Sequence, residues 1–269
     1  MSSLQSQGTA LVTGASSGIG AIYAQRLAAR GFDLLLVARD QERLEAAASA
    51  LRDAHGVQVE VLKADLTQKD DVLKLEQRLR SDSSISLLLN NAGVAADGLL
   101  ANADLDQLER MIQLNITAVT RLASAAAAGF AKAGRGTIIN IASVVALFPE
   151  RFNATYSASK AYVLSLTQSL NAELDGTGVK VQAVLPGVTR TEIWERSGID
   201  ASQIPEEMVM EAGEMVDAAL AGLDQGELVT IPSLPKKWFR RPVFQRPAAR
   251  ATPPASAPAA WRRAPRRIR

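Results

Sequence analysis

The sequence contains no cysteine and a single histidine among its 269 residues. Without cysteine, the chain has neither disulfides nor thiolate metal sites. His55 stands beside Gly56 after an expected helix, where a solvated loop residue is the simplest interpretation. The composition thus argues against serine–histidine hydrolases and histidine metal centres, and we expect no metal site.

Long apolar runs are also missing. No stretch approaches the roughly 18 apolar residues of a membrane span. Residues 1–7 lack the basic and apolar regions of a secretory signal. We therefore expect a cytoplasmic protein without a membrane partner.

Acidic residues are absent from Lys236 onward, where 11 of the 30 lysines and arginines lie. The formal net charge of +2 thus conceals an acidic body, because residues 1–235 hold 19 bases against 28 acids. Seven of the 11 prolines also fall at or after Pro235. This composition cannot readily build a core. We expect an N-terminal extension at 1–7, one domain at 8–233, and a disordered basic tail at 234–269.

The tail leaves two readings open. A basic arm for nucleic acid or acidic surfaces is one, and an unstructured extension is the other. We favour the extension and do not expect a nucleic-acid partner.

Apolar runs alternate with helical patterns through the body of the chain. We expect strands at 9–13, 33–37, 57–63, 85–89, 137–141, 179–185 and 228–231. We expect helices near 21–30, 41–53, 69–80, 104–132, 154–174 and 206–223. Such alternation requires a parallel sheet covered on both faces, because each crossover needs a helix to return the chain. The predicted fold is α/β, with seven parallel strands in one domain.

A glycine cluster follows the first expected strand. Gly14, Gly18 and Gly20 have the spacing G-x-x-x-G-x-G and precede a helix. A tight turn, a closely approachable backbone and a helix N-terminus together suit a pyrophosphate. This position indicates a dinucleotide site.

Tyr156 and Lys160 are four residues apart in an expected helix, so their side chains share a face. A nearby ammonium favours the phenolate, and we expect Lys160 to lower the pKa of Tyr156 from about 10. Ser143 can hydrogen-bond the same substrate oxygen. The pattern predicts proton exchange with an alcohol or carbonyl.

Six motifs in this order and spacing resemble the short-chain dehydrogenase/reductase family, over roughly residues 8–232. They are Thr13-Gly-Ala-Ser-Ser-Gly-Ile-Gly20, Asn90-Asn-Ala-Gly93, Asn115, Ser143, Tyr156-x-x-x-Lys160 and Pro186-Gly187-x-x-x-Thr191. The resemblance implies a doubly wound, Rossmann-type sheet that binds NAD or NADP.

The resemblance also implies roles for individual residues. Tyr156 would be the general acid or base, Ser143 would orient the carbonyl, and Lys160 would bind the nicotinamide ribose. Asn115 would hold a water that passes protons to bulk. Asp65 and Leu66 would contact adenine, Asn91 and Gly93 would line the ribose side, and Thr191 would bond the carboxamide. The full set of expected cofactor contacts is Gly14, Ser16, Ser17, Gly18, Ile19, Gly20, Arg39, Asp65, Leu66, Asn91, Ala92, Gly93, Tyr156, Lys160, Pro186, Gly187, Val188 and Thr191.

The expected cofactor is NADP, with NAD as the alternative. NAD-preferring members of the family place an acid just after the second strand, where this sequence has Ala38 followed by Arg39. A guanidinium there can form charge-assisted bonds to a 2′-phosphate. The neighbouring carboxylate of Asp40 can partly offset that charge.

The expected substrate is a small carbonyl or alcohol compound, bound by residues 94–98, 145–152 and a lid at 190–210. Apolar side chains there suit a hydrophobic ketone, although core packing explains them equally well. A β-ketoacyl reductase and a dinucleotide sensor without turnover remain alternatives. We also expect a dimer or tetramer, and the alanine-rich face 122–131 can pair helices across a two-fold axis.

Overall fold

A computed structural model describes residues 7–96, 98–193 and 205–233. Residues 1–6 of the expected extension, residues 194–204 of the expected lid and the tail from residue 234 lie outside these ranges. Among the described helices, none is long and apolar enough to cross a membrane.

Seven parallel strands form the central sheet in the order β3-β2-β1-β4-β5-β6-β9. Their bounds are β1 Thr9–Thr13, β2 Asp33–Ala38, β3 Val59–Lys63, β4 Ile85–Asn90, β5 Gly136–Ile141, β6 Val179–Val184 and β9 Val229–Thr230. The order runs outward from β1 in one direction and from β4 in the other, which makes the space between their carboxyl ends a topological switch point. The predicted Rossmann-type fold is confirmed.

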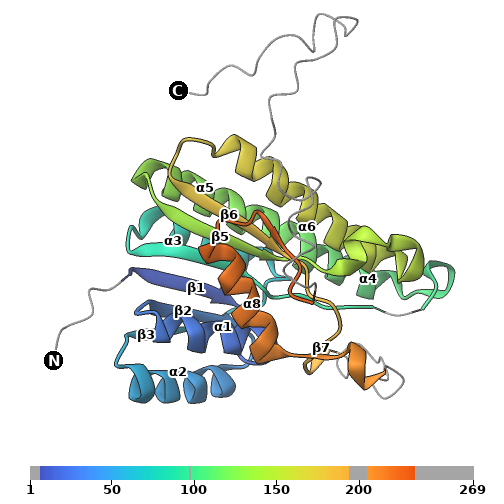
Figure 1. Cartoon of the computed structure of the whole chain (residues 1–269), viewed down its shortest axis with the longest axis horizontal. Coiled ribbons are helices and arrows are strands. Elements are labelled where there is room, and N and C mark those ends of the chain that lie inside the picture. The colour runs from blue at the N-terminus through green and yellow to red at the C-terminus, as the bar shows by residue number, and fades with distance from the viewer. Residues whose placement is uncertain (1–6, 97, 194–204, 234–269) are drawn as a thin grey trace, which may run out of the picture.

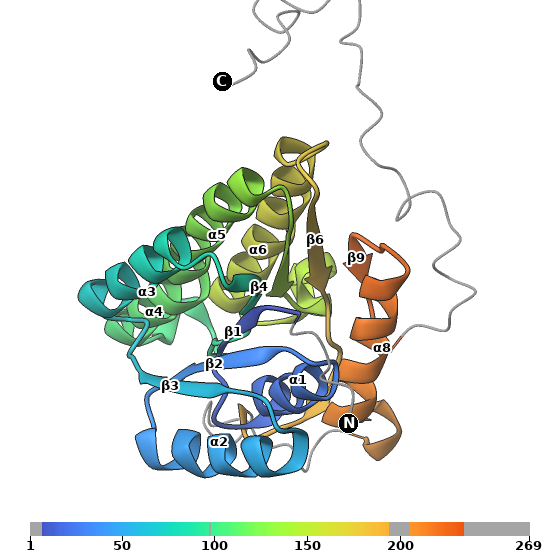
Figure 2. The same cartoon turned by 90° about the vertical axis from the view of Figure 1, so that its left-hand side faces the viewer.

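Helices cover both faces of this sheet (Figures 1 and 2). One layer holds α1 Gly18–Ala29, α2 Gln41–His55 and α8 Ala212–Asp224; the other holds α3 Lys69–Ser81, α4 Leu105–Ile112, α5 Val119–Ala133 and α6 Ala154–Glu173. Side chains of β2 alternate between the layers, since Leu34 and Leu36 join the α1 core while Leu35 and Val37 join the α3–α5 core. This burial on both sides explains the near-continuous apolar strands.

The long helix expected at 104–132 has a different structure in its middle. α4 and α5 are joined by a π-helical segment, Gln113–Ala118, which contains Asn115. Such segments recur at functional sites, and their wider turn depends on tertiary contacts that sequence periodicity does not encode.

The region before the last strand also differs from expectation. A helix was expected near 206–223, but Glu206–Met208 forms only a 3₁₀ turn and α8 begins at Ala212. Between them, β8 (Met210–Glu211) pairs with β7 (Thr189–Arg190) in a small separate sheet. The helix is short at this end because the chain first pairs with the segment after β6.

The alanine-rich stretch of α5 lies against its own chain. Ala123, Ala125 and Ala126 are buried in the core beneath α3. Small side chains let the two helices approach closely; a Cβ added to Gly129 would lie 2.8 Å from the Leu79 carbonyl oxygen. These side chains are thus used within the fold, whereas Ser124 and Ala128 of the same stretch are exposed, and pairing of this helix across a two-fold axis stays a prediction.

Candidate active site at the carboxyl ends of β1, β4 and β5

The ends of β1 and β4 are tied together by one buried hydroxyl. Thr13 Oγ1 donates to the Leu89 carbonyl at 3.1 Å and accepts from the backbone N–H groups of Asn91 and Ala92 at 2.9 and 3.1 Å. The Asn91 amide donates to the carbonyl oxygens of Thr13 at 2.9 Å and Gly14 at 3.3 Å. The loops that follow both strands are thereby fixed at the switch point.

The glycine turn between β1 and α1 is tightly packed. A Cβ on Gly20 would clash with the Gly14 carbonyl oxygen, so only glycine fits there. Ser16 and Ser17 form the turn, and Ser17 begins α1 without a side-chain cap, which leaves its first N–H groups for another acceptor. A pyrophosphate fits this turn, with Ile19 in the first helical turn.

The second expected feature of the nucleotide site is Arg39, which is exposed directly after β2. Its neighbour Asp40 is engaged elsewhere: one carboxylate oxygen caps α2 at the Arg43 N–H, at 3.0 Å, and the other lies 3.5 Å from the Arg43 guanidinium. The carboxylate therefore does not have to pair with Arg39. These residues fit a 2′-phosphate.

Asp65 and Leu66 follow β3 as expected, but both are partly committed to the fold. Asp65 Oδ1 accepts from the Thr67 N–H at 2.9 Å and from its hydroxyl at 2.8 Å. The Leu66 side chain is buried in the core. Their expected contact with adenine stays a prediction.

Ser143, Tyr156 and Lys160 converge from β5 and α6, as the sequence predicts. The Ser143 side chain lies near enough to the Tyr156 phenol to lower its pKa. The Lys160 ammonium is buried, donates to the Ile141 carbonyl oxygen at 2.9 Å, and lies 5.8 Å from the centroid of the Tyr156 ring. Helix α6 thus places phenol and ammonium on the face that meets the end of β5.

Burial sets the protonation of both groups. It raises the pKa of Tyr156 to about 12, against which the nearby Ser143 side chain acts. It lowers the pKa of Lys160 from 10.5 to about 8. The expected decrease in the Tyr156 pKa is therefore wrong, because desolvation of the phenolate outweighs the stabilising contacts.

Asn115 lies beside this cluster and holds the loop after β4. Its Oδ1 accepts from the Val94 N–H at 3.0 Å, and its Nδ2 donates to the Val94 carbonyl at 2.9 Å and to Ser159 Oγ at 3.3 Å. Gly93 passes between the two groups: a Cβ there would lie 3.2 Å from Asn115 Oδ1 and 3.6 Å from Lys160 Nζ. The side chain of Asn115 is engaged with protein groups, and its expected water-holding role stays a prediction.

The segment after β6 completes the edge of the site. The Pro186 carbonyl accepts from the Val144 N–H at 3.0 Å and from Ser143 Oγ at 3.4 Å. The Val188 carbonyl accepts from Met210 N at 2.9 Å. Thr191 reaches the glycine turn, since a Cβ on Gly18 would lie 3.4 Å from its side chain. Gly187, which lies between Pro186 and Val188 in the chain, packs near Ser233.

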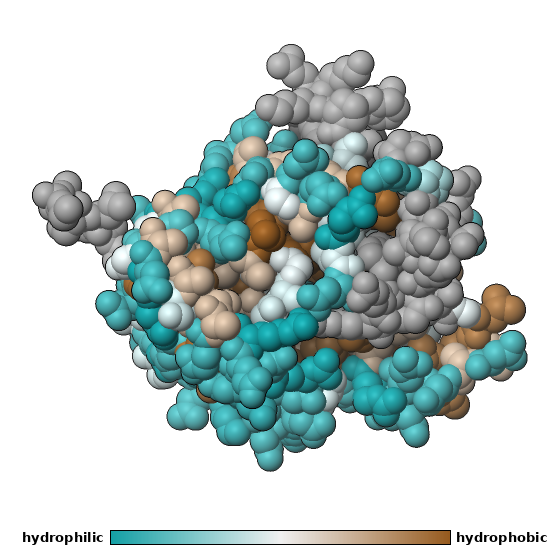
Figure 3. Space-filling model, turned by 90° about the horizontal axis from the view of Figure 1, so that it is seen from below, coloured by the Kyte–Doolittle hydropathy of each residue, from teal (hydrophilic) through white to brown (hydrophobic). Residues whose placement is uncertain are grey.

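Apolar side chains surround the site on two loops. Leu99 is 74% exposed, and Phe148 and Phe152 are 53% and 51% exposed. Figure 3 shows a mostly hydrophilic face with hydrophobic surface in a central hollow and at one end. An apolar rim of this kind suits a substrate with apolar substituents.

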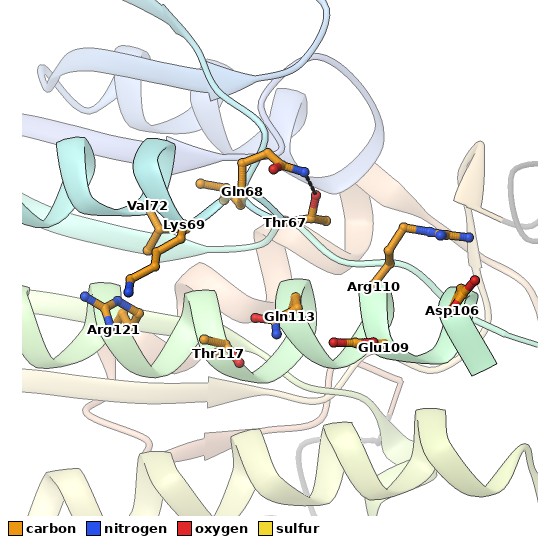
Figure 4. A pocket seen from close by; sticks show the side chains of 11 residues that line it. Thr67, Gln68, Lys69, Val72, Asp106, Glu109, Arg110, Gln113, Thr117 and Arg121 are labelled. Atoms are coloured by element: carbon orange, nitrogen blue, oxygen red, sulfur yellow. Dashed lines mark hydrogen bonds between the residues drawn. The ribbon is translucent and has the colours of Figure 1, made fainter.

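A separate cavity of about 550 Å³ lies between α3 and the α4–α5 helix (Figure 4). Leu66 is the one expected site residue in its lining. Its other walls carry charges of both signs, including Lys69, Arg110, Asp106 and Glu109. Ser143, Tyr156 and Lys160 do not line this cavity. It is therefore distinct from the candidate active site at β5 and α6.

The fold and site together define a class of protein. A parallel sheet with a glycine turn at its switch point, beside a half-buried tyrosine and a buried lysine, belongs to Rossmann-type oxidoreductases that use a nicotinamide dinucleotide.

Comparison with known proteins agrees and is more specific. The family model for the short chain dehydrogenases matches residues 8–201. A short-chain dehydrogenase from Sphingobium yanoikuyae in complex with NADPH is 56% identical, with a TM-score of 0.82 over 84% of this chain and 88% of that one. The chain belongs to the short-chain dehydrogenase family and is an oxidoreductase.

Two further relatives are informative. The bulky-bulky ketone specific alcohol dehydrogenase from Comamonas testosteroni is 48% identical, with a TM-score of 0.79 over 87% of this chain and 90% of that one. The very-long-chain 3-oxoacyl-CoA reductase of Anas platyrhynchos is 32% identical over 188 residues, which are 68% of this chain and 60% of that reductase.

Sequence reasoning missed several residues that build the site. Thr13 ties β1 to β4, and Ser159 joins Asn115 to the Tyr156 carbonyl, to which it donates at 2.7 Å. Asn153 begins α6. Thr13 and Ser159 stand inside quoted motifs, and an asparagine three residues before Tyr156 is an N-cap signal, so each was accessible in principle.

Proposed function

We propose that the protein is an NADP(H)-dependent reductase of ketones with bulky apolar substituents, with Tyr156 as general acid. The observation that carries this proposal is the convergence of Tyr156, Ser143 and the buried Lys160 ammonium at the switch point of the sheet, with the ammonium 5.8 Å from the centre of the Tyr156 ring. A dinucleotide sensor needs the glycine turn but has no use for this trio, which argues against the binding alternative.

The residues divide the work in the following way. The glycine turn, Arg39 and Lys160 would hold NADPH, which supplies a hydride when bound. Ser143 Oγ donates a hydrogen bond to the ketone oxygen and orients it. Tyr156 gives its phenolic proton to the same oxygen, and the Lys160 ammonium stabilises the phenolate that remains. Asn115 keeps the Val94 end of the loop in place beside them.

The raised pKa of Tyr156 favours reduction over oxidation. With a pKa of about 12, the phenol keeps its proton at neutral pH and is ready to donate it. Oxidation of an alcohol needs the phenolate as base, which becomes available only as the pH rises. We therefore propose carbonyl reduction as the neutral-pH direction.

The substrate class is supported by the apolar rim and by the Comamonas testosteroni relative, whose substrates are described as bulky-bulky ketones. The relative from Anas platyrhynchos favours a second candidate, a 3-oxoacyl thioester reductase. A single screen separates them: NADPH oxidation with diaryl and alkyl aryl ketones, small ketones, aldehydes and 3-oxoacyl thioesters, with NADH alongside.

We expect the highest kcat/KM with NADPH and bulky ketones. Tyr156→Phe should bind NADPH with unchanged affinity and lose at least about 100-fold in turnover, because it removes the proton donor alone. A folded Tyr156→Phe protein with full turnover would refute the role of Tyr156 as general acid. A higher kcat/KM for 3-oxoacyl thioesters than for ketones would favour the second candidate function.

Cofactor preference has its own test. Arg39→Ala should lower kcat/KM for NADPH by about 10- to 100-fold, the worth of a charge-assisted bond, and leave that for NADH unchanged. Ala38→Asp should raise use of NADH by supplying a ribose acceptor. Equal losses with both cofactors would show that Arg39 does not distinguish them.

A further inference from the structure

Asn153 is connected to both sides of the site by one planar amide. Its Oδ1 accepts from the Tyr156 backbone N–H at 3.0 Å, and its Nδ2 donates to the Gly98 carbonyl oxygen at 2.9 Å. Positions 98 and 153 are far apart in sequence and lie in the loop after β4 and at the start of α6. The two bonds therefore link the helix that carries Tyr156 to a different loop.

The first bond fixes the catalytic helix. Asn153 is the N-cap of α6, and Tyr156 is the third residue of that helix. The Asn153 carbonyl also accepts from the Ser157 N–H at 2.9 Å. The backbone from which the Tyr156 phenol projects is thus held directly by Asn153.

The second bond fixes the substrate side. Gly98 immediately precedes Leu99, 74% exposed, and Leu100, 53% exposed. This loop is anchored at its start by the two bonds between Val94 and Asn115. The Gly98 bond anchors it again just before these apolar side chains.

Only some cap residues can make both bonds. Serine, threonine and aspartate supply the oxygen that a helix N-terminus needs, but a serine hydroxyl is too short to span to Gly98 and a carboxylate has no proton to donate. The amide of asparagine has an acceptor and a donor on opposite arms, as this position uses them.

We propose that Asn153 is a positioning residue that sets the separation between the Tyr156 phenol and the apolar loop 98–100, and thereby the binding of bulky ketones. The proposal rests on the ketone reductase activity proposed above. Asn153 acts through Tyr156 and Gly98, and its effect should appear mainly in KM when only the Gly98 bond is lost.

Three variants of the full-length chain test this. Asn153→Ser keeps a cap and loses the Gly98 bond, Asn153→Ala loses both, and Asn102→Ser is a matched control on an exposed asparagine of the same loop. Hydrogen–deuterium exchange should be faster in residues 94–103 for Asn153→Ser and Asn153→Ala, and faster in the first turn of α6 for Asn153→Ala alone. Asn102→Ser should match the wild type.

Kinetics give the second readout. Asn153→Ser should raise KM for a bulky ketone about fivefold, the worth of one neutral hydrogen bond, with kcat within about twofold of wild type. Asn153→Ala should lower kcat as well. Unchanged exchange in 94–103 together with unchanged KM in Asn153→Ser would overturn the proposal. A wild type that reduces no ketone would instead refute the proposed function, while the exchange data would still decide whether Asn153 links the two segments.

Discussion

Lys160 is a cation held almost out of reach of water, and only 7% of its surface is exposed. Burial lowers its pKa to about 8 from 10.5, because the desolvated ammonium is less stable than in water. The single hydrogen bond to the Ile141 carbonyl offsets part of this cost. Buried ionisable groups with shifted pKa values cluster at functional sites, which agrees with the proposed role of the Lys160 ammonium beside the phenol.

This burial predicts a dependence of stability on pH. Between pH 8 and 10.5 the unfolded chain keeps the Lys160 proton and the folded chain loses it, so the free energy of unfolding should rise with pH. The contribution is complete above the unfolded pKa of 10.5 and is lost as pH falls through about 8. Its slope is at most about 1.4 kcal/mol per pH unit.

The measurement is urea unfolding from pH 7.5 to 10, compared between the wild type and Lys160→Met, which keeps most of the side-chain length. Subtracting the two curves cancels every other titrating group. The difference should increase in favour of the wild type as the pH rises; a flat difference would mean that the folded pKa is not lowered.

At the scale of elements, the site depends on how β1 is joined to β4. Thr13 is buried and makes three hydrogen bonds to the turn that follows β4. Thr13→Val keeps the shape and removes the hydroxyl, leaving backbone groups of Asn91, Ala92 and Leu89 without this partner. We expect a loss of about 1–3 kcal/mol in unfolding free energy and weaker NADPH binding.

Two controls sharpen this test. Thr13→Ser restores the hydroxyl and should recover most of both losses. Thr9→Val removes a hydroxyl near the surface that contacts Ser84 at 3.3 Å, and should change stability by no more than about 0.5 kcal/mol. If Thr13→Val were no worse than Thr9→Val by urea unfolding, the junction would not depend on this side chain.

The elements also show what could be predicted from the sequence. The first strand was placed at 9–13, as observed, because a buried parallel strand has an unbroken apolar run ending at the glycine turn. The π-helical segment around Asn115 could not be predicted, since its wider turn depends on tertiary contacts that the sequence pattern does not encode. The β7–β8 pair could not be predicted either, because two residues per strand carry no detectable alternation.

Within the site, too, residue types and spacing could be predicted from the sequence, whereas burial and backbone contacts could not. Ser143, Tyr156 and Lys160 were found from their types and spacing, and the structure brings them together. The direction of the Tyr156 pKa was missed because burial is a property of the packed fold. The two bonds of Asn153 were missed because Gly98 is a backbone partner, which no side-chain pattern reveals.

At the scale of the whole molecule, ion pairs join the first helix to the last described one. Arg26 pairs with Asp217 at 2.7 Å and Arg30 with Asp224 at 2.9 Å, between α1 and α8, which pack together (Figure 2). The arginine side chains are 38% exposed and the aspartates 56% and 57%, so water screens each pair, which contributes less than about 1 kcal/mol. The buried Met215 and Val216 of α8 hold this side of the molecule more firmly.

The boundary of the domain is the whole-molecule prediction. We expect a chain ending at Ser233 to keep the thermal unfolding midpoint and ketone reductase activity of the full-length protein, because the composition from Lys236 cannot build a core. Circular dichroism and the NADPH assay check this. Loss of cooperative unfolding would show that the tail belongs to the domain.

The same pair of proteins tests the alternative role of the tail. If the basic arm binds nucleic acid, the full-length chain should show a salt-dependent affinity for RNA or DNA that the shorter chain lacks. We expect neither protein to bind. A cytoplasmic location and assembly into a dimer or tetramer also stay predictions, the latter to be checked by sedimentation of both chains.

The acceptor chosen by the Lys160 ammonium has an evolutionary consequence. A peptide oxygen is present at position 141 whichever amino acid stands there, so point mutation cannot delete it. The residue at position 141 can therefore change during evolution while the ammonium keeps its hydrogen-bond acceptor. Substitutions in the surrounding loops can then alter the substrate without changing how Lys160 is held.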